Sequence, residues 1–139
     1  MAKTVDVTWV DKLQFVGTDN TKHSVVMSSQ DDDNGMGMSP SSLLLVALGG
    51  CTSYDIVSIL KKKRQKLTGL EVSVTGEQEE DPPWTYRKVH VHYKVTGEGL
   101  SEKAVADAIT LSEERYCSVA ATVRGSAEIT FDYEIVDDA

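Results

Sequence analysis

One stretch of the sequence, from Ser39 to Leu67, constrains the fold more than any other. Ser39 is a favourable N-cap residue, and Pro40 suits the first helical position, where its missing N–H is not needed. The run from Leu43 to Leu48 is apolar on every side, and a helix that is apolar all round is a buried helix. Lysines cluster in the last turns, where they complement the helix dipole, and Gly69 is the expected terminator. We therefore predict a long buried helix from Ser39 to about Leu67.

The length of this predicted helix exceeds what one small domain can cover. A helix of about 27 residues is about 40 Å long, whereas a folded chain of 139 residues is only about 30 to 35 Å across. A second copy of the chain is the simplest cover for the remaining apolar surface. The run Leu43–Leu48 and the pair Gly49-Gly50 would then lie near a shared two-fold axis. The sequence thus predicts a homodimer.

The remaining segments carry strand and turn signals and include one further helix. Apolar residues at every second position, or apolar runs beside a polar turn, predict strands around Val5–Trp9, Leu13–Gly17, His23–Ser28, Leu70–Val74, Val89–Val95 and Ile129–Ile135. A second helix should begin at Ser101, and the polar stretch from Ser29 to Met38 should be a solvated loop. Short links join the strand pairs, which favours antiparallel pairing. We predict an α+β class, with an antiparallel sheet and helices on one side of it, in a single domain spanning residues 1–139.

The composition excludes several classes of function. The chain has a formal net charge of -8 and a sequence pI of about 4.8, so it repels the phosphates of nucleic acids, and we expect no nucleic-acid partner. The longest apolar run, Leu43–Leu48, is too short to span a bilayer, and the N-terminal residues contain no apolar signal region. We therefore expect a cytoplasmic protein with no membrane partner.

Two histidines, His90 and His92, lie on the polar face of a predicted strand. Histidines two positions apart on a strand can share a metal ion, but no Cys or carboxylate has a matching spacing in the sequence. We expect a solvent-facing pair of side chains, no metal and no cofactor.

The two cysteines, Cys51 and Cys117, are the strongest candidates for chemistry. In a cytosolic chain of this size they are either inert buried thiols or reactive ones, and the residues alone leave both interpretations open. Cys51 follows the apolar run inside the predicted buried helix, where a thiol is inert unless a cation stabilises its thiolate. Arg115, two residues before Cys117, could supply that cation if the second helix packs on the first.

Two motifs give the chain a family likeness. The stretch Ser39–Cys51, with the sequence SPSSLLLVALGGC, resembles the central helix of the OsmC/Ohr family, which comprises osmotically inducible and organic hydroperoxide resistance proteins. The stretch Arg115–Val119, with the sequence RYCSV, resembles the second-cysteine motif of the same family. Trp9–Gly17 and Asp55–Leu60 are most similar to the YhfA-like branch. The resemblance extends over nearly the whole chain.

This resemblance implies a fold, an assembly and a reaction. The fold would be an intertwined homodimer in which antiparallel sheets wrap around two central helices. The reaction would be that of a thiol-dependent peroxidase, in which Cys51 is the peroxidatic thiol and Cys117 the resolving thiol. The implied partners are an organic hydroperoxide with an apolar tail and an external dithiol reductant, and the implied role is protection against oxidative or osmotic stress.

The chain departs from the pattern of active members at two positions. Active members carry a Glu ten positions before the first cysteine, where this chain has Ser41. They also stabilise the thiolate with an Arg from the N-terminal strands, whereas the first Arg of this chain is Arg64. Three hypotheses remain at this point: a peroxidase, a non-peroxidatic dimer that binds an apolar small molecule at the subunit interface, and a structural pair of thiols.

Overall fold

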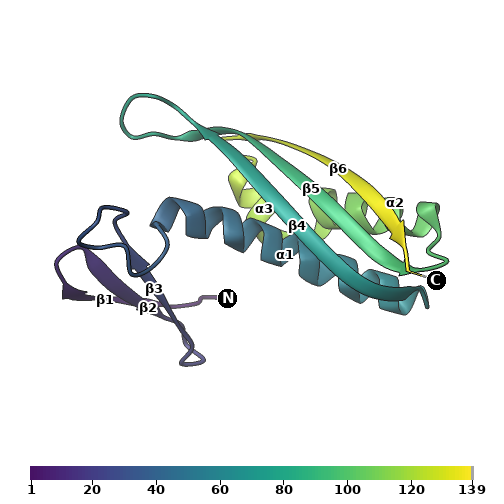
Figure 1. Cartoon of the computed structure of the whole chain (residues 1–139), viewed down its shortest axis with the longest axis horizontal. Coiled ribbons are helices and arrows are strands. Elements are labelled where there is room, and N and C mark those ends of the chain that lie inside the picture. The colour runs from purple at the N-terminus through teal and green to yellow at the C-terminus, as the bar shows by residue number, and fades with distance from the viewer. Residues whose placement is uncertain (139) are drawn as a thin grey trace. The chain divides into compact units, whose positions relative to one another are not determined.

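The computed structural model describes residues 1–138 and divides the chain into two compact units, residues 1–44 and the part from Leu45 onward. Figure 1 shows the order of the elements along the chain. They are β1 (Asp6–Asp11), β2 (Gln14–Thr18), β3 (Ser24–Ser28), α1 (Pro40–Lys62), β4 (Lys66–Gln78), β5 (Tyr86–Glu98), α2 (Glu102–Leu111), the π turn η1 (Ser112–Tyr116), α3 (Ser118–Val123) and β6 (Glu128–Asp137). The predicted α+β class is confirmed.

The first unit, residues 1–44, contains a three-stranded antiparallel sheet in the order β1-β2-β3. The hairpin between β2 and β3 closes on Asp19, whose side chain accepts hydrogen bonds from the backbone N–H groups of Thr21 (3.0 Å) and His23 (2.9 Å). The hairpin predicted from the polar turn is therefore confirmed. Several apolar side chains of this sheet are exposed, including Val7 (60%) and Trp9 (66%).

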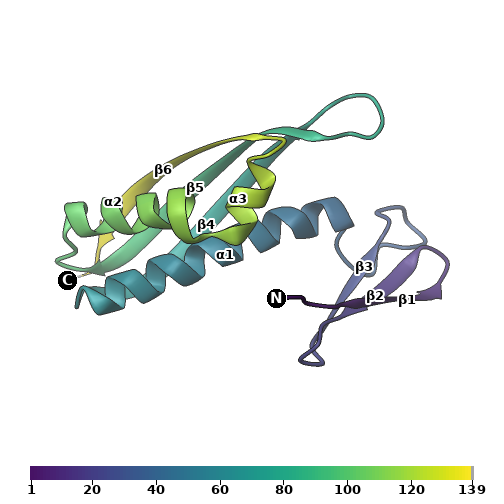
Figure 2. The same ribbon diagram turned by 180° about the vertical axis from the view of Figure 1, so that it is seen from behind.

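The second unit contains a three-stranded sheet in the order β4-β5-β6, with α1, α2 and α3 on one of its faces (Figures 1 and 2). The side chains on the helix-covered face of β5 are at most 2% exposed: Val89, Val91, Tyr93 and Val95. Three side chains of α1 in the same core are completely buried: Leu48, Ile56 and Leu60. Burial of each such side chain stabilises the fold by about 1.5 to 3 kcal/mol, so the main core of the protein lies here.

Helix α1 is only partly covered along its length. Gly49 allows close approach to β4, since a Cβ there would lie 3.0 Å from a methyl group of Val74. A Cβ at Gly50 would meet no atom within 4 Å, and Val46 and Tyr54 are 53% and 77% exposed. The glycine at position 49 therefore allows close approach between α1 and a strand of the same chain.

By its length and its mean hydropathy of 1.8, α1 passes the test for a helix that could cross a bilayer. Its longest uninterrupted run of apolar residues, in contrast, is much shorter than a bilayer-spanning segment. Leu48, Ile56 and Leu60 are nevertheless completely buried within protein. This burial is typical of the core helix of a folded domain.

The end of α1 differs from the prediction. The helix stops at Lys62 and not near Leu67, and Arg64 adopts a positive φ of 55° that turns the chain back. Strand β4 then begins at Lys66, so Gly69 lies inside a strand instead of terminating the helix. Tertiary pairing with β5 outweighs the helix propensity of the lysine-rich segment.

Strand β6 departs from the antiparallel expectation. It pairs with β5 in parallel, with Asp132 opposite His92. The reason is the crossover through α2, η1 and α3, since a parallel neighbour requires a long connection. Ser101 does cap α2 as predicted, and the helix was expected to continue to Tyr116, where the structure has α2 end at Leu111 and the π turn η1 follow it. Helix α3 was not expected, because a segment of six residues is too short to show a helical period.

Candidate thiol site

The structure brings Cys51 and Cys117 together. Cys51 lies in the middle of α1 and is partly buried, and Cys117 lies between η1 and α3 with 3% of its surface exposed. Both thiols are free, and they are near enough to one another for Cys51 to help raise the pKa of Cys117. A pair of neighbouring thiols is the minimum that a disulfide-forming reaction requires.

Cys117 is held by the start of α3. Its sulfur accepts a hydrogen bond from the backbone N–H of Ala120 (3.3 Å), so it serves as the N-cap of that helix. Burial raises the pKa of the Cys117 thiol to about 12, and the contact with Cys51 acts in the same direction. Cys117 is therefore protonated at neutral pH, and a nucleophilic attack by its sulfur requires a base that takes the proton.

The π turn η1 leads directly into Cys117 and is hydrogen-bonded to α1, the helix that carries Cys51. It turns Ser112 and Glu113 into the core and leaves its other three side chains exposed. The hydroxyl of Ser112 bonds to the backbone carbonyl of Thr52 (3.2 Å) and to the carboxylate of Asp55 (3.0 Å). Because Thr52 directly follows Cys51 in the chain, these two bonds hold η1 against the part of α1 that carries the thiol.

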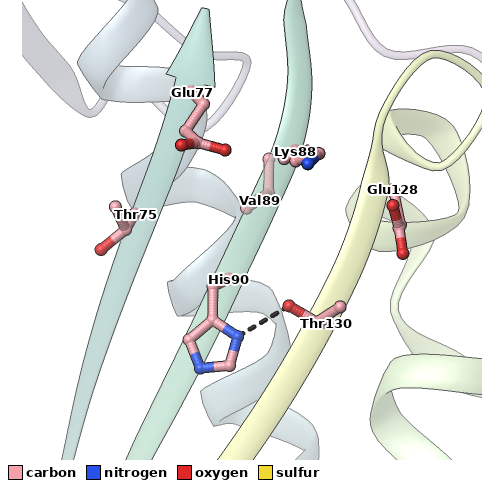
Figure 3. Close-up of a pocket in the computed structure, with 7 residues that line it drawn as sticks. All are labelled: Thr75, Glu77, Lys88, Val89, His90, Glu128 and Thr130. Carbon is pink, nitrogen blue, oxygen red and sulfur yellow. Dashed lines mark hydrogen bonds between the residues drawn. The ribbon is translucent and has the colours of Figure 1, made fainter.

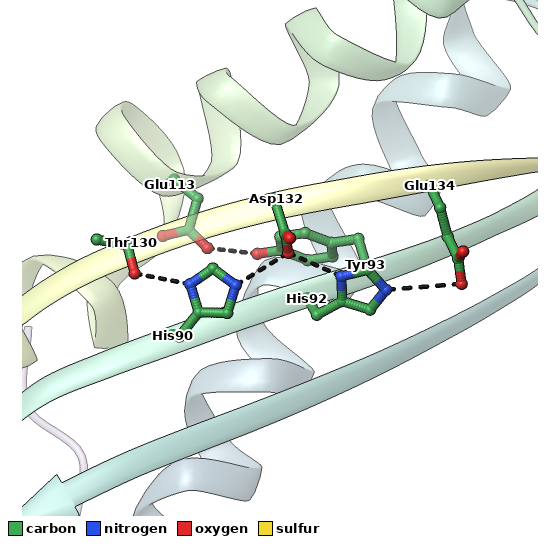
Figure 4. Close-up of polar contacts among 7 residues, drawn as sticks. All are labelled: His90, His92, Tyr93, Glu113, Thr130, Asp132 and Glu134. Carbon is green, nitrogen blue, oxygen red and sulfur yellow. Dashed lines mark hydrogen bonds and ion pairs between the residues drawn. The ribbon is translucent and has the colours of Figure 1, made fainter.

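Glu113 is a buried carboxyl group in this turn, with 1% of its surface exposed. The hydroxyl of Tyr93 donates to its Oε1 atom (Figure 4), while Oε2 has no hydrogen-bond partner within residues 1–138. Burial raises the pKa of Glu113, and the Tyr93 hydroxyl and the Arg124 guanidinium act against that rise. Such a carboxyl can hold a proton at a pH at which an exposed Glu is fully ionised.

The hydroxyl of Tyr93 is buried together with the Glu113 carboxyl that accepts its hydrogen bond. Burial raises the pKa of Tyr93 well above its ordinary value, and the hydrogen bond to Glu113 acts in the same direction, so the hydroxyl keeps its proton. Tyr93 therefore serves as a hydrogen-bond donor to Glu113.

The other residues proposed from the sequence lie elsewhere. Arg115 is exposed, and its guanidinium carbon lies 5.9 Å from the ring centroid of Tyr116. Ser41 lies in the first turn of α1, within the first unit, where its hydroxyl is 3.3 Å from that of a neighbouring serine. A different guanidinium reaches η1, because Arg124 donates to the backbone carbonyl of Glu113.

A hollow of about 410 Å³ lies on the outer face of the β4-β5-β6 sheet (Figure 3). It is lined by Thr75, Glu77, Lys88, Val89, His90, Glu128 and Thr130. Neither cysteine belongs to its lining, and charged or polar side chains make up most of its wall. The hollow is therefore separate from the thiol site.

The histidines lie on this outer face, as predicted, but carboxylates accompany them. Asp132 Oδ1 lies 2.9 Å from His90 Nε2 and 2.7 Å from His92 Nδ1, and Glu134 Oε1 lies 3.6 Å from His92 Nε2 (Figure 4). Spacing along the sequence did not indicate this carboxylate, because the parallel register of β6 brings it from a distant part of the chain. The hydrogen bond to Asp132 raises the pKa of His92 and lowers that of Asp132. Within residues 1–138, no three His, Cys, Asp or Glu side chains are arranged to hold a metal ion.

Three residues near the thiols were not anticipated from the sequence: Tyr93, Glu113 and Arg124. Glu113 offered one signal, since an acidic residue four positions before Cys117 lies about one helical turn away from it. Tyr93 occupies an apolar position in an alternating strand, as any core aromatic residue does, so its hydrogen bond to Glu113 could not be foreseen from the sequence. Arg124 follows a helix that was not predicted.

Comparisons with known proteins agree with the fold and the motifs. The family model described as OsmC-like protein matches residues 30–132. Protein YhfA of Escherichia coli strain K12 is 40% identical over 130 residues, which cover 94% of this chain and 96% of that protein. The crystal structure of an OsmC-like protein from Mycoplasma pneumoniae has a TM-score of 0.84 at 16% identity, with 98% of each chain covered. The organic hydroperoxide resistance protein OhrB of Bacillus subtilis has a TM-score of 0.62 at 12% identity, with 96% of this chain and 98% of that chain covered.

Proposed function

The chain belongs to the OsmC-like family, and from this membership we propose that it is a thiol-dependent peroxidase that reduces organic hydroperoxides. Family membership and the fold shared with organic hydroperoxide resistance proteins support a role related to peroxide stress. The observation that carries the more specific proposal is that the free thiols of Cys51 and Cys117, 66 positions apart in the chain, are near enough in the fold to interact. This pair supplies one sulfur to be oxidised and a second sulfur to resolve it.

Cys51 is the peroxidatic thiol in this proposal, because it is the more exposed of the two. Its thiolate attacks the hydroperoxide, the O–O bond breaks, an alcohol leaves after protonation, and Cys51 becomes a sulfenic acid. The sulfur of Cys117 then attacks the sulfur of Cys51, so that an S–S bond forms, the S–O bond breaks and water leaves. An external dithiol reduces the disulfide and restores both thiols.

A homodimer is part of the proposal. In the second unit, α1 leaves Val46 and Tyr54 exposed beside the open position at Gly50. In the first unit, Val7 and Trp9 are among several exposed apolar side chains. Uncovered apolar surface of this kind favours association, and a second copy of the chain is the partner that we propose. Two free thiols also suit the reducing cytoplasm, which is the location we propose.

The rate of the first step should reflect the missing family residues. Ser41 stands where active members carry Glu, and no Arg precedes Arg64 in the chain. We therefore expect Cys51 to react more slowly than the peroxidatic cysteine of members that carry the pair. For this reason the reaction is best measured with stoichiometric hydroperoxide instead of by turnover.

A second candidate function is the binding of an apolar small molecule without peroxidase chemistry. A hollow of about 440 Å³ in the first unit favours it, because its wall is mainly apolar. The side chains that make the wall apolar include Val5, Val7, Val25, Met27 and Leu43.

Treatment of the reduced protein with one equivalent of cumene hydroperoxide is expected to give a Cys51–Cys117 disulfide, detected by mass spectrometry. Cys117→Ser should stop at the sulfenic acid of Cys51, which dimedone traps, and Cys51→Ser should retain an intact Cys117 thiol. Two intact thiols in the wild-type protein after prolonged exposure would refute the peroxidase. Binding of a fluorescent apolar probe would then favour the second candidate. Light scattering is expected to show a dimer, and a monomer would refute the proposed assembly.

A further inference from the structure

The π turn η1 and helix α3 form a corner of the chain that carries Cys117. The backbone N–H of Cys117 donates to the carbonyl of Ser112 (3.0 Å), and its sulfur accepts a hydrogen bond from Ala120 at the start of α3. Arg124, directly after α3, donates back to the carbonyl of Glu113 in η1. These bonds tie the two halves of the corner together, so the position of the Cys117 sulfur follows the position of Ser112.

The hydroxyl of Ser112 anchors this corner to α1. Ser112 is completely buried, and its one hydroxyl proton is shared between the carbonyl of Thr52 (3.2 Å) and the carboxylate of Asp55 (3.0 Å). Thr52 is completely buried as well, and it directly follows Cys51 in the chain. A path of two hydrogen bonds, one at the hydroxyl and one at the carbonyl of Ser112, therefore joins the backbone beside Cys51 to the backbone of Cys117.

We propose that Ser112 is the positioning residue that holds Cys117 beside Cys51 for disulfide formation, with Asp55 as the second acceptor that fixes its hydroxyl. A thiol held beside its partner reacts as if at a high local concentration, because its freedom of orientation is lost before the S–S bond forms. Without the hydroxyl of Ser112, the Cys117 thiol spends less time within reach of Cys51. The inference rests on the proposed function, because it concerns the resolving step of that reaction.

A positioning role and a purely structural role of Ser112 predict different results for the disulfide equilibrium. A buried hydrogen bond that only supports the fold stabilises the dithiol and disulfide forms equally, so its loss leaves the equilibrium between them unchanged. A bond that positions Cys117 lowers the conformational entropy that closing the disulfide costs. Its loss therefore shifts the equilibrium toward the dithiol form.

The equilibrium is measured by incubating the protein with mixtures of reduced and oxidised glutathione and analysing acid-quenched samples by mass spectrometry. In this exchange the two protein thiols become a disulfide while oxidised glutathione becomes two molecules of reduced glutathione. Ser112→Ala should lower the equilibrium constant about 10-fold, the size expected for the loss of one buried hydrogen bond, which raises the reduction potential by about 30 mV. Asp55→Ala, which removes one of the two acceptors, should lower it less. Asp55→Asn, which keeps an oxygen acceptor, should remain close to the wild type.

Ser28→Ala is the matched control, because it removes another buried serine hydroxyl that bonds to backbone carbonyls. Ser28 lies in the first unit, and its hydroxyl donates to the carbonyls of Ser29 (2.9 Å) and Gly37 (3.1 Å). This variant should lose stability in urea denaturation but keep the wild-type equilibrium constant with glutathione. Circular dichroism confirms that each variant is folded before its constant is compared.

A wild-type equilibrium constant in Ser112→Ala would overturn the positioning role, whatever the change in stability. If Ser112→Ala does not fold, the Asp55 variants decide, because equal constants in Asp55→Ala and the wild type would overturn it as well. A wild-type protein that forms no Cys51–Cys117 disulfide with glutathione would also overturn it, since the two thiols are then not held within reach.

Cumene hydroperoxide separates this inference from the proposed function. Ser112→Ala should form the sulfenic acid of Cys51 at the wild-type rate and convert it to the disulfide about 10-fold more slowly. Wild-type thiols that stay intact with hydroperoxide but form the disulfide with glutathione would refute the peroxidase alone. The glutathione equilibrium of Ser112→Ala would still decide the positioning role in that case.

Discussion

His92 and Tyr93 are adjacent in β5 but belong to polar clusters on opposite faces of one sheet (Figure 4). His92 is bonded to the exposed carboxylate of Asp132, and Tyr93 donates to the buried carboxyl of Glu113. The two carboxyl groups respond in opposite directions, because hydrogen bonds from histidine lower the pKa of Asp132 whereas burial raises that of Glu113. The comparison shows that solvent access, more than the presence of a partner, decides whether a carboxyl here can serve as a proton acceptor.

The largest expected difference between the two faces is in stability. Tyr93→Ala should lower the free energy of unfolding by about 3 to 5 kcal/mol, because it leaves a cavity in the core and removes the partner of Glu113. His92→Ala, the matched change one position away on the open face, should leave the urea midpoint nearly unchanged. Urea denaturation followed by circular dichroism measures both. Equal losses in the two variants would contradict the contrast between the faces.

A smaller effect is expected in the pH dependence of stability. The pKa of Glu113 is raised above its ordinary value of 4.5, so the folded state holds this proton more tightly than the unfolded state does. The stabilisation that results is fully present below about pH 4.5 and is lost as the pH rises through the folded-state pKa. Glu113→Gln should therefore gain stability relative to wild type over that interval, as measured by thermal unfolding at a series of pH values. Glu114→Gln should follow the wild-type curve, and a wild-type slope in Glu113→Gln would show that its carboxyl is not perturbed.

The smallest effect concerns the open face and is visible in titration. Asp132→Asn should lower the pKa of His92, because the hydrogen bond to Asp132 is the main cause of its elevation. By linkage, the elevated pKa of His92 stabilises the fold below about pH 6.5, and this contribution is lost as the pH rises through the folded-state pKa. NMR titration of the imidazole signals measures the shift. Glu134→Gln serves as the weaker comparison, since Glu134 is the more distant partner at 3.6 Å. A His92 pKa that is the same in wild type and Asp132→Asn would mean that the bond does not form in solution.

The elements that the sequence predicts correctly are those specified by nearby residues. The buried helix beginning at Ser39–Pro40, the hairpin around Asp19 and the N-cap at Ser101 each have a local cause that can be read without the rest of the chain. The end of α1 was misplaced because pairing with β5, a tertiary interaction, decides where β4 begins. The parallel direction of β6 was likewise hidden, because it depends on a crossover whose last helix has six residues.

The residues of the candidate site could be predicted only where their residue type is both chemically reactive and rare in the chain. Two cysteines are few enough to be singled out, and the structure places them near enough to interact. Glu113 is one of many acidic residues in the chain, and only its burial distinguishes it from Glu114 beside it. The partnership of His92 with Asp132 depends on strand register, which the sequence does not specify between strands joined by a crossover.

The parallel pairing of β6 also has a consequence for the order in which the protein can be completed during synthesis. Strand β5 is the central strand of its sheet, yet one of its two neighbours, β6, leaves the ribosome after all the other described elements. Until β6 emerges, β5 presents an open edge, and such edges are where nascent chains join one another and aggregate. Both cysteines are synthesised before that edge is closed, because α1 and the segment from η1 to α3 precede β6 in the chain.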